Sequence, residues 1–398
     1  MIGLCFGLIV LAMAISVPLC ALLIALGHRL GTFDSAGVAG QVKDRSRRVP
    51  NTGGVAIFWA IALPLAGALV VGNFRPEWLP IAASANVPYL VQKSWMAVVL
   101  LGCLLVLHVM GLVDDRRPLP PIPKLILMVA PALAAPLLTD TRLLTLVDPW
   151  VGGTWLSVLI TAAWFLAITN AMNFLDNMDG LSAGIATIVS ACLLVVTIDK
   201  QQWLLAACLC LVIGACAGFL VFNSPRRTGA KLFMGDGGSL VVGFLLAFVT
   251  VRVTYYDPGS AQSSRAHALL MPLVILAVPL YDLVVVTAVR LWNGKSPMVG
   301  DMNHASHRLV KRGVGKAGAV YLLWGVTLAT GVAGLALAKA DGVVAGLLGA
   351  AVLLLLALLA GFEYASPVPA PAASLLHAAP QTAPPSPAGA GNEGERAP

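Results

Sequence analysis

The sequence predicts an all-α polytopic integral membrane protein with about 11 transmembrane helices. Hydrophobic residues make up 59% of the 398-residue chain and charged residues only 11%, and the mean hydropathy is +0.88. Apolar runs of about 20 residues, the length that crosses a bilayer as a helix, recur along the chain. These runs are continuous instead of alternating, which argues against a transmembrane β-barrel.

Each predicted span is an apolar run bounded by charged or turn-forming residues. In chain order the spans are residues 2–26, 53–72, 94–113, 124–139, 154–172, 180–198, 203–223, 238–254, 268–290, 318–338 and 342–362. The first span lacks the basic start and the cleavage site of a signal peptide, so we expect it to be retained. Residues 1–364 are expected to form one transmembrane domain. The Pro/Ala-rich residues 365–398 have little to bury, and we expect a disordered tail.

Lysine and arginine are distributed unequally between the two faces of this topology. The loops around residues 43–48, 116–117, 226–231 and 308–316 are basic, whereas the opposite loops hold isolated cations such as Arg75. By the positive-inside rule the basic face is cytoplasmic. We therefore expect a multi-pass plasma (inner) membrane protein with its N-terminus outside and its C-terminal tail in the cytoplasm. The net charge of +7 follows this topology, so no nucleic-acid partner is expected.

The polar run from Asn170 to Asp179 is unusual, because polar groups at membrane depth are costly and need a reason. Asn170, Asn173 and Asp176 are spaced by three residues, and Asp179 follows after three more. This spacing predicts a polar stripe along one helix that ends at the Asp179–Gly180 pair. The stripe indicates a functional site.

Two further acidic motifs fall on the same predicted face. Asp114 and Asp115, followed by Lys124, combine oxygen ligands suited to Mg²⁺ with a cation that binds phosphate. A solvated interfacial loop is the alternative. Asp236 stands between glycines just before a span, where free N–H groups attract anions. A plain helix cap is the alternative there.

A third cluster follows the ninth span and contains Asp301, His304, His307 and Arg308. Histidine and arginine are suited to phosphate binding or proton transfer. A zinc site is disfavoured because no third ligand stands at a suitable spacing, and a bland juxtamembrane loop is the alternative. Asp282 lies inside the ninth span, where an acid indicates either function or pairing with a neighbouring helix. We expect all these clusters to form one active site at the cytoplasmic face.

With these motifs in this order, the chain resembles the polyprenyl-phosphate N-acetylhexosamine-1-phosphate transferases of glycosyltransferase family 4. Within them it is most similar to the undecaprenyl-phosphate GlcNAc-1-phosphate transferase-like branch. The resemblance rests on Gly111-Leu-Val-Asp114-Asp115 with Lys124 downstream, the run Asn170–Leu181, Phe233-Met-Gly-Asp236, and Pro279-x-x-Asp282. Two departures stand out. Asn177 replaces the usual glycine, and the three consecutive histidines of the related phospho-N-acetylmuramoyl-pentapeptide transferases are absent.

The resemblance implies a Mg²⁺-dependent phosphotransferase, with Mn²⁺ as a substitute metal. It would transfer N-acetylglucosamine 1-phosphate, or a related N-acetylhexosamine 1-phosphate, from a UDP-sugar to polyprenyl (undecaprenyl) phosphate. The products would be a polyprenyl-diphosphate sugar and UMP, in the first membrane step of a cell-envelope polysaccharide such as lipopolysaccharide or teichoic acid. The implied partners are the UDP-sugar, the lipid and the membrane, and a homodimer is left open.

The resemblance also implies roles for individual residues. The catalytic residues would be Asp114, Asp115, Asp176 and Asp236, of which Asp236 and Asp176 would hold the metal. The residues near the nucleotide would be Asp179, Asn223, Phe233 and Asn173. The phosphate-binding residues would be Lys124, His304, His307 and Arg308. Asp282 and Asn177 have no assigned role.

Three alternatives remain at this level. Within the family, the chain could be a phospho-N-acetylmuramoyl-pentapeptide transferase of peptidoglycan synthesis. From another class, it could be a proton- or cation-coupled transporter that uses the acids as ion sites. The placement of the acids at one face and the absence of an internal repeat argue against a transporter. A homologue that has lost its activity is the third alternative, with Asn177 as its only sequence hint.

Overall fold

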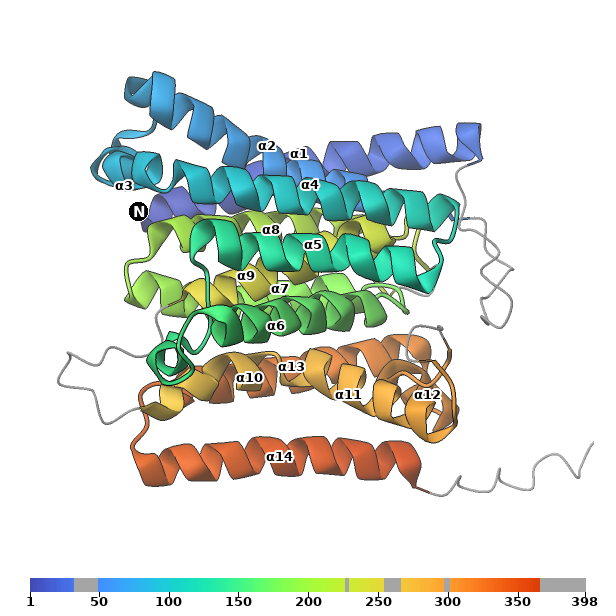
Figure 1. Cartoon of the computed structure of the whole chain (residues 1–398). Coiled ribbons are helices and arrows are strands. Elements are labelled where there is room, and N and C mark those ends of the chain that lie inside the picture. Colours follow the sequence, from blue (N-terminus) through green and yellow to red (C-terminus); the bar gives the residue numbers. More distant parts are fainter. Residues whose placement is uncertain (32–48, 226–228, 254–265, 297–300, 366–398) are drawn as a thin grey trace, which may run out of the picture. The chain divides into compact units, whose positions relative to one another are not determined.

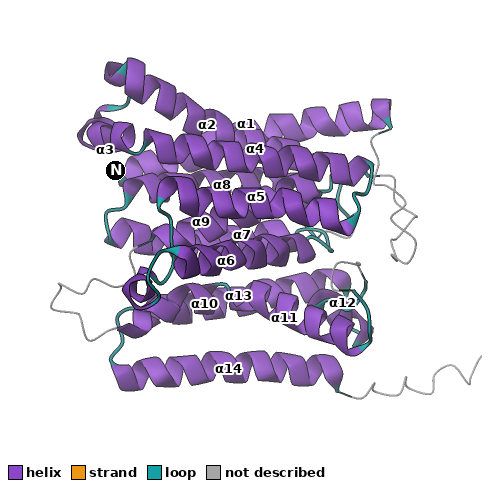
Figure 2. Ribbon diagram, in the orientation of Figure 1, coloured by secondary structure: helices purple, strands orange, loops and turns teal. Residues whose placement is uncertain are grey.

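The computed structural model describes residues 1–31, 49–225, 229–253, 266–296 and 301–365, so residues 366–398 of the expected tail lie outside it. Over these ranges the protein consists of helices joined by turns and loops, with no strand (Figure 1, Figure 2). Residues Met1–Tyr364 form one compact unit. The predicted all-α class is confirmed.

Nine helices of the described residues are long and apolar enough to cross a membrane. They are α1 (Ile2–Leu30), α2 (Gly53–Phe74), α4 (Ser94–Arg116), α5 (Pro121–Thr139), α6 (Trp155–Phe174), α7 (Leu181–Asp199), α8 (Trp203–Asn223), α13 (Lys316–Leu337) and α14 (Gly342–Tyr364). Shorter helices connect them: α3 (Val87–Gln92), α12 (Ala305–Lys311), and the 3₁₀ turns Pro76–Trp78, Ile81–Asn86, Thr145–Trp150 and Ala266–Leu270. The multi-pass character is therefore confirmed.

Two of the eleven predicted spans differ from a simple crossing helix. One corresponds to α9 (Asp236–Arg252), which has only 17 residues. The other corresponds to a pair, α10 (Met271–Ile275) and α11 (Ala277–Trp292), that is bent by 70°. Pro279 in the first turn of α11 has no N–H for the carbonyl of Ile275, which removes a helical hydrogen bond at the bend. The count of eleven spans stays a prediction.

The short helix α9 is the core of the described bundle. Its residues from Gly237 to Thr250 are buried, and it packs against α2, α4 and α6 (Figure 1). Gly243 allows the close approach of α6, because an added Cβ would lie 2.8 Å from the Thr169 Cα. Asp236, the first residue of α9, is therefore placed where four helices meet.

The predicted polar stripe on a single helix is wrong in its second half. Helix α6 ends at Phe174, and residues 175–180 form consecutive turns before α7 begins. Asn177 contributes to this ending, since its Nδ2 donates to the Phe174 carbonyl at 2.6 Å. Asp176 and Asp179 therefore lie in a turn instead of continuing the line of Asn170 and Asn173. Side chains that compete for backbone hydrogen bonds favour such a break.

Helix α4 is longer than predicted. Its expected end was residue 113, but the helix continues to Arg116 and therefore includes Asp114 and Asp115. Both acids thus project from a rigid helical turn instead of a loop. Helical side chains are positioned more accurately than loop side chains, which suits a site that must hold two phosphates in line.

Candidate active site

An ammonium between two carboxylates forms the centre of the first polar cluster. Lys124, near the start of α5, donates to Asp114 Oδ2 at 2.7 Å and to Asp236 Oδ2 at 2.5 Å. The other oxygen of Asp114 accepts the backbone N–H of Leu119 at 2.7 Å. All three charged side chains are at most 23% exposed, so solvent screens their interactions only partly. The motifs of α4, α5 and α9 are thus brought together.

Asp115 joins α4 to the first turn of α9. Its Oδ1 accepts the backbone N–H of Asp236 at 3.1 Å, and its Oδ2 lies 3.4 Å from the Gly237 nitrogen. The Asn51 amide donates to the same carboxylate at 3.0 Å. Asp115 therefore occupies the helix N-terminus, where free N–H groups and the helix dipole stabilise negative charge. Asn51 is a site residue that the sequence analysis missed, although it stands in the conspicuous run Pro50-Asn-Thr-Gly-Gly54.

Two glycines allow α4 and its neighbours to approach α9 this closely. An added Cβ at Gly111 would lie 2.4 Å from the Gly237 nitrogen, and one at Gly54 would lie 2.3 Å from the Gly238 nitrogen. Gly235 has φ +69°, a left-handed conformation that glycine adopts without strain. The Gly53 and Gly54 amides also donate to the Phe233 and Met234 carbonyls, both at 2.8 Å, which fixes the segment before Asp236.

Asn173 connects α6 to the same centre. Its Nδ2 donates to Asp236 Oδ1 at 2.8 Å and to Ser239 Oγ at 2.9 Å. Both oxygens of Asp236 therefore have partners, one on α6 and one on α5. From the buried side, His108 Nδ1 lies 2.7 Å from the Gly237 carbonyl and its ring stacks on Phe58 at 4.2 Å. The position of Asp236 is thus set by four helices.

The side chains of Asp179 and Asn223 connect the turn between α6 and α7 to the segment before α9 by hydrogen bonds. Asn223 accepts the Gly180 N–H at 2.7 Å and donates to the Leu232 carbonyl at 2.7 Å. Asp179 Oδ2 accepts the Ala230 N–H at 2.8 Å. Both side chains therefore shape the turn that carries the half-buried Asp176. The predicted nucleotide roles of Asp179, Asn223 and Phe233 stay predictions.

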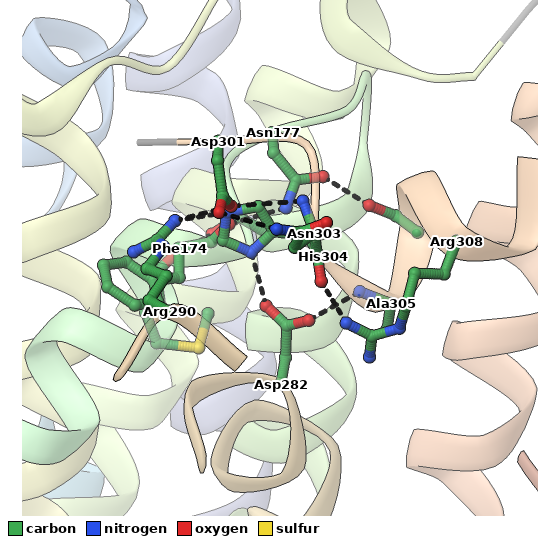
Figure 3. Close-up of polar contacts among 12 residues, drawn as sticks. Phe174, Asn177, Asp282, Arg290, Asp301, Asn303, His304, Ala305 and Arg308 are labelled. Atoms are coloured by element: carbon green, nitrogen blue, oxygen red, sulfur yellow. Dashed lines mark hydrogen bonds and ion pairs between the residues drawn. The ribbon is translucent and has the colours of Figure 1, made fainter. Parts of the chain in front are cut away.

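A second polar cluster surrounds Asp282, which is fully buried in α11 (Figure 3). Its Oδ2 lies 2.8 Å from His304 Nδ1, and its Oδ1 accepts the Ala305 N–H at 2.7 Å. Asp282 therefore pairs with the start of α12 and orients the His304 ring. Of the two alternatives left open for this acid, the structure shows pairing with a neighbouring helix.

Arg290 was not identified from the sequence, although it is the largest fully buried side chain of the described residues. It donates to Asp301 at 3.0 Å, and its guanidinium lies 5.0 Å from the centre of the Phe174 ring. Burial raises the pKa of Asp301, but the hydrogen bonds from Arg290 and Asn303 and the Arg290 charge together outweigh burial and keep that pKa below its usual range. The Asn303 N–H and amide also donate to Asp301, at 3.1 and 2.8 Å.

His307 and Arg308 have different environments within α12. His307 is half-buried, and burial, followed by the nearby His304 and Lys311, lowers its pKa to about 4. It is therefore neutral at pH 7 and would donate or accept a hydrogen bond instead of supplying charge. Arg308 is buried and forms an ion pair with Glu363, with Nη2 to Oε2 at 2.7 Å. Its predicted phosphate role stays a prediction.

The end of α6 connects the two clusters. Asn173 contacts Asp236, whereas the ring of the next residue, Phe174, contacts the Arg290 guanidinium and the His304 ring. Asn177 then accepts a 2.6 Å hydrogen bond from Ser306 of α12. The residue that departs from the family pattern thus links the α6–α7 turn to α12, and a glycine at this position could not make that bond.

The donor set of the first cluster suits a hard cation that arrives with phosphates. The described residues contain no group of three or more His, Cys, Asp or Glu side chains arranged to hold a metal alone. Mg²⁺ does not need one, because it usually binds one or two carboxylates together with substrate phosphates and water. Asp236 offers such a carboxylate, and Lys124 at its Oδ2 marks the position as one that attracts positive charge.

Comparison with known proteins identifies a protein family that the chain matches over part of its length. Residues 97–254 match the model of Glycosyl transferase family 4. Over this range the chain is similar to the family. The matched range contains most of the first cluster, namely Asp114, Asp115, Lys124, Asn173 and Asp236, whereas Asn51 lies outside the range. The resemblance inferred from the sequence motifs is confirmed.

Several relatives in the family have named activities. The chain is 25% identical over 294 residues to the probable undecaprenyl-phosphate N-acetylglucosaminyl 1-phosphate transferase of Bacillus subtilis, covering 71% of each protein. It is 29% identical over 290 residues to the decaprenyl-phosphate N-acetylglucosaminephosphotransferase of Mycobacterium tuberculosis, covering 66% of each. With the undecaprenyl-phosphate alpha-N-acetylglucosaminyl 1-phosphate transferase of Escherichia coli it shares 29% identity over 225 residues, which are 54% of this chain and 58% of the relative.

Proposed function

We propose that this protein transfers a sugar 1-phosphate, with N-acetylglucosamine as the preferred sugar, from a UDP-sugar to a polyprenyl phosphate. The products are a polyprenyl-diphosphate sugar and UMP. The names of the three relatives combine a polyprenyl phosphate with N-acetylglucosamine, which supports both the lipid and the sugar. They also favour this reaction over transfer of a muramoyl pentapeptide. Initiation of a cell-envelope polysaccharide is the pathway that this product suits.

The observation that carries the proposal is the Lys124 ammonium held between Asp114 and Asp236 beside the N-terminus of α9. Transfer between two phosphates requires that negative charge be neutralised and that the attacking and leaving oxygens be held in line. An ammonium and a row of backbone N–H groups supply the neutralisation. Three helices fix their relative positions, so little reorganisation is needed during the reaction.

The lipid phosphate is the nucleophile in this proposal. Its oxygen forms a bond to the β-phosphorus of the UDP-sugar while the bond to the UMP oxygen breaks. The second pKa of a phosphate monoester is about 6, so much of the nucleophile is already a dianion at pH 7. Asp114 and Asp115 then need only orient the lipid phosphate, and Lys124 with His304 and His307 would bind the phosphate oxygens.

Mg²⁺ is the proposed cofactor, with Mn²⁺ as a substitute, and Asp236 and Asp176 are its proposed ligands. When bound it would neutralise charge that develops on the departing UMP phosphate. Asp236 presents its carboxylate from the first turn of α9, and Asp176 lies in the adjoining turn after α6. The uridine would lie near Asp179, Asn223, Phe233 and Asn173.

A membrane assay tests the reaction. Purified protein in detergent is given polyprenyl phosphate, a panel of UDP-sugars and Mg²⁺, and UMP release is measured. The expected outcome is UMP release with UDP-N-acetylglucosamine, its loss with EDTA, and its abolition by Asp115→Asn or Asp236→Asn. Asp341→Asn, at the exposed start of α14, is the matched control and should retain activity. Undiminished turnover in EDTA contradicts the metal assignment.

The proposed orientation places the site in the cytoplasm, the N-terminus outside, and the protein in the plasma (inner) membrane. Cysteine labelling in whole cells tests it, because all seven native cysteines are buried. A cysteine at position 116 should react only after the cells are opened, whereas one at position 75 should react in intact cells. A homodimer remains a separate prediction, which light scattering of the purified protein would decide.

A further inference from the structure

The last helix, α14, carries one charged side chain, and that side chain is buried. Glu363 is the only charged residue of Gly342–Tyr364, and its side chain has 0% relative exposure. Its Oε1 has no hydrogen-bond partner among the described residues. A buried carboxylate is strongly unfavourable unless a positive group compensates it. Only 17% of the apolar stretch of α14 is buried, and the helix packs against α13 and α12.

Arg308 of α12 supplies the compensating charge. Its Nε donates to Glu363 Oε2 at 2.8 Å, and its Nη2 lies 2.7 Å from the same oxygen. The Tyr281 hydroxyl of α11 also donates to Oε2, at 2.8 Å. Arg312 Nε reaches the Glu363 backbone carbonyl at 2.9 Å, and the Arg308 guanidinium lies 5.3 Å from the Tyr364 ring centre. The contact therefore joins α11, α12 and α14.

All three nitrogens of the Arg308 guanidinium are buried against protein groups, although Nη2 contacts Glu363 as an ion pair without a hydrogen bond. Its remaining nitrogen, Nη1, donates to the Asn303 carbonyl in the loop that precedes α12 (Figure 3). The residue is only 6% exposed. Burial opposes its charge, but the Glu363 carboxylate outweighs burial and raises the pKa of Arg308. A guanidinium that is buried and paired with a carboxylate in this way is not exposed to a substrate phosphate.

We propose that Glu363 and Arg308 form a latch through which the last helix holds α12 in its catalytic position. Asp282 holds the start of α12 through His304 and the Ala305 N–H, and the Glu363–Arg308 pair holds its middle. The half-buried His307 lies between these two attachments. Glu363 and Arg308 are then positioning residues, and Arg308 does not contact the phosphate. Only the catalytic consequence of the latch rests on the proposed transferase function.

Cysteine accessibility tests the latch without any need for turnover. Ser306 is 1% exposed, and cysteine is a close substitute in size but weakens the hydrogen bond to Asn177, so all labelling rates are compared within the same position-306 background. In detergent, a cysteine at position 306 should react slowly with a maleimide in the parent protein. Glu363→Gln should raise the labelling rate at least about tenfold, because the uncompensated Arg308 would leave its buried position. The control Asp341→Asn, at the exposed residue directly before the same helix, should leave the rate unchanged.

Activity then separates positioning from direct binding. Glu363→Gln should lower kcat/KM for UMP release by roughly tenfold to a hundredfold, the effect of displacing a binding group by about 1 Å. The double variant Glu363→Gln/Arg308→Gln removes both buried charges and should recover most of the activity and the slow labelling. Arg308→Gln alone leaves the buried Glu363 carboxylate without its cation, so its labelling rate and kcat/KM should change as they do in Glu363→Gln.

The possible outcomes are distinct. If the double variant regains slow labelling but stays inactive, Arg308 acts on the substrate and its assignment to the latch is wrong. If position 306 labels at the same rate with and without Glu363, α14 does not hold α12 and the proposal is overturned. If the parent protein releases no UMP with any UDP-sugar, the proposed function fails, while the labelling result still decides the latch.

Discussion

Gly111→Ala is the sharpest test of the way α4 meets α9. An added Cβ would lie 2.4 Å from the Gly237 nitrogen and 2.5 Å from the Asp236 carbonyl carbon. These are backbone atoms of a buried helix, so no flexible side chain can move aside. Ordinary van der Waals contact begins near 3.4 Å, and the two helices must therefore separate by about 1 Å. Asp115 lies one turn further along α4, so this separation would move its carboxylate away from the Asp236 and Gly237 N–H groups.

A displacement of about 1 Å in a catalytic group typically costs about 100-fold in rate. We therefore expect Gly111→Ala to lower kcat/KM for UMP release by about two orders of magnitude, with a stability loss of about 1–3 kcal/mol from overpacking. The assay is UMP release per folded protein, with thermal unfolding measured in the same detergent. Gly102→Ala is the matched control, since its added Cβ meets nothing within 4 Å on the same helix. A Gly111→Ala protein with parent-like kcat/KM would refute the reasoning.

Three further predictions follow from the same geometry. Lys124→Gln leaves Asp236 without its cation, so UMP release should fall at least about 100-fold; unchanged turnover would count against the charge-neutralising role. His108→Phe keeps a ring but removes the hydrogen bond to the Gly237 carbonyl, which should lower the free energy of unfolding by about 0.5–1.5 kcal/mol, and a rise in melting temperature would contradict this. His307 has a folded pKa of about 4, below the value of about 6.5 of an unfolded histidine. The unfolded state therefore binds the extra proton between those pH values, so stability is lost as pH falls through this window, and His307→Gln should show a shallower loss in melts from pH 7 to 4.

The sequence alone determined the features that depend on local pattern. Runs of apolar residues long enough to cross a bilayer predicted the helices, because each helix satisfies its own backbone hydrogen bonds in lipid. The acids at the ends of these runs marked the candidate site, since a charge near the membrane is too costly to be incidental. The family motifs around Asp114, Asp176 and Asp236 then indicated phosphate chemistry, and the match over residues 97–254 supports the resemblance.

Tertiary structure decided which of these groups meet and where the helices end. Nothing in the spacing of Lys124 and Asp236, which are 112 residues apart, predicts the 2.5 Å contact between them. The same holds for Asn51 with Asp115 and for Arg308 with Glu363, which are separated by 64 and 55 residues. Such contacts depend on how helices pack, and packing is set by side chains and glycines on several segments at once. The predicted stripe failed for a related reason: Asp176 and Asp179 have helical spacing, but hydrogen bonds from Asn177 and to Asn223 close a turn there instead.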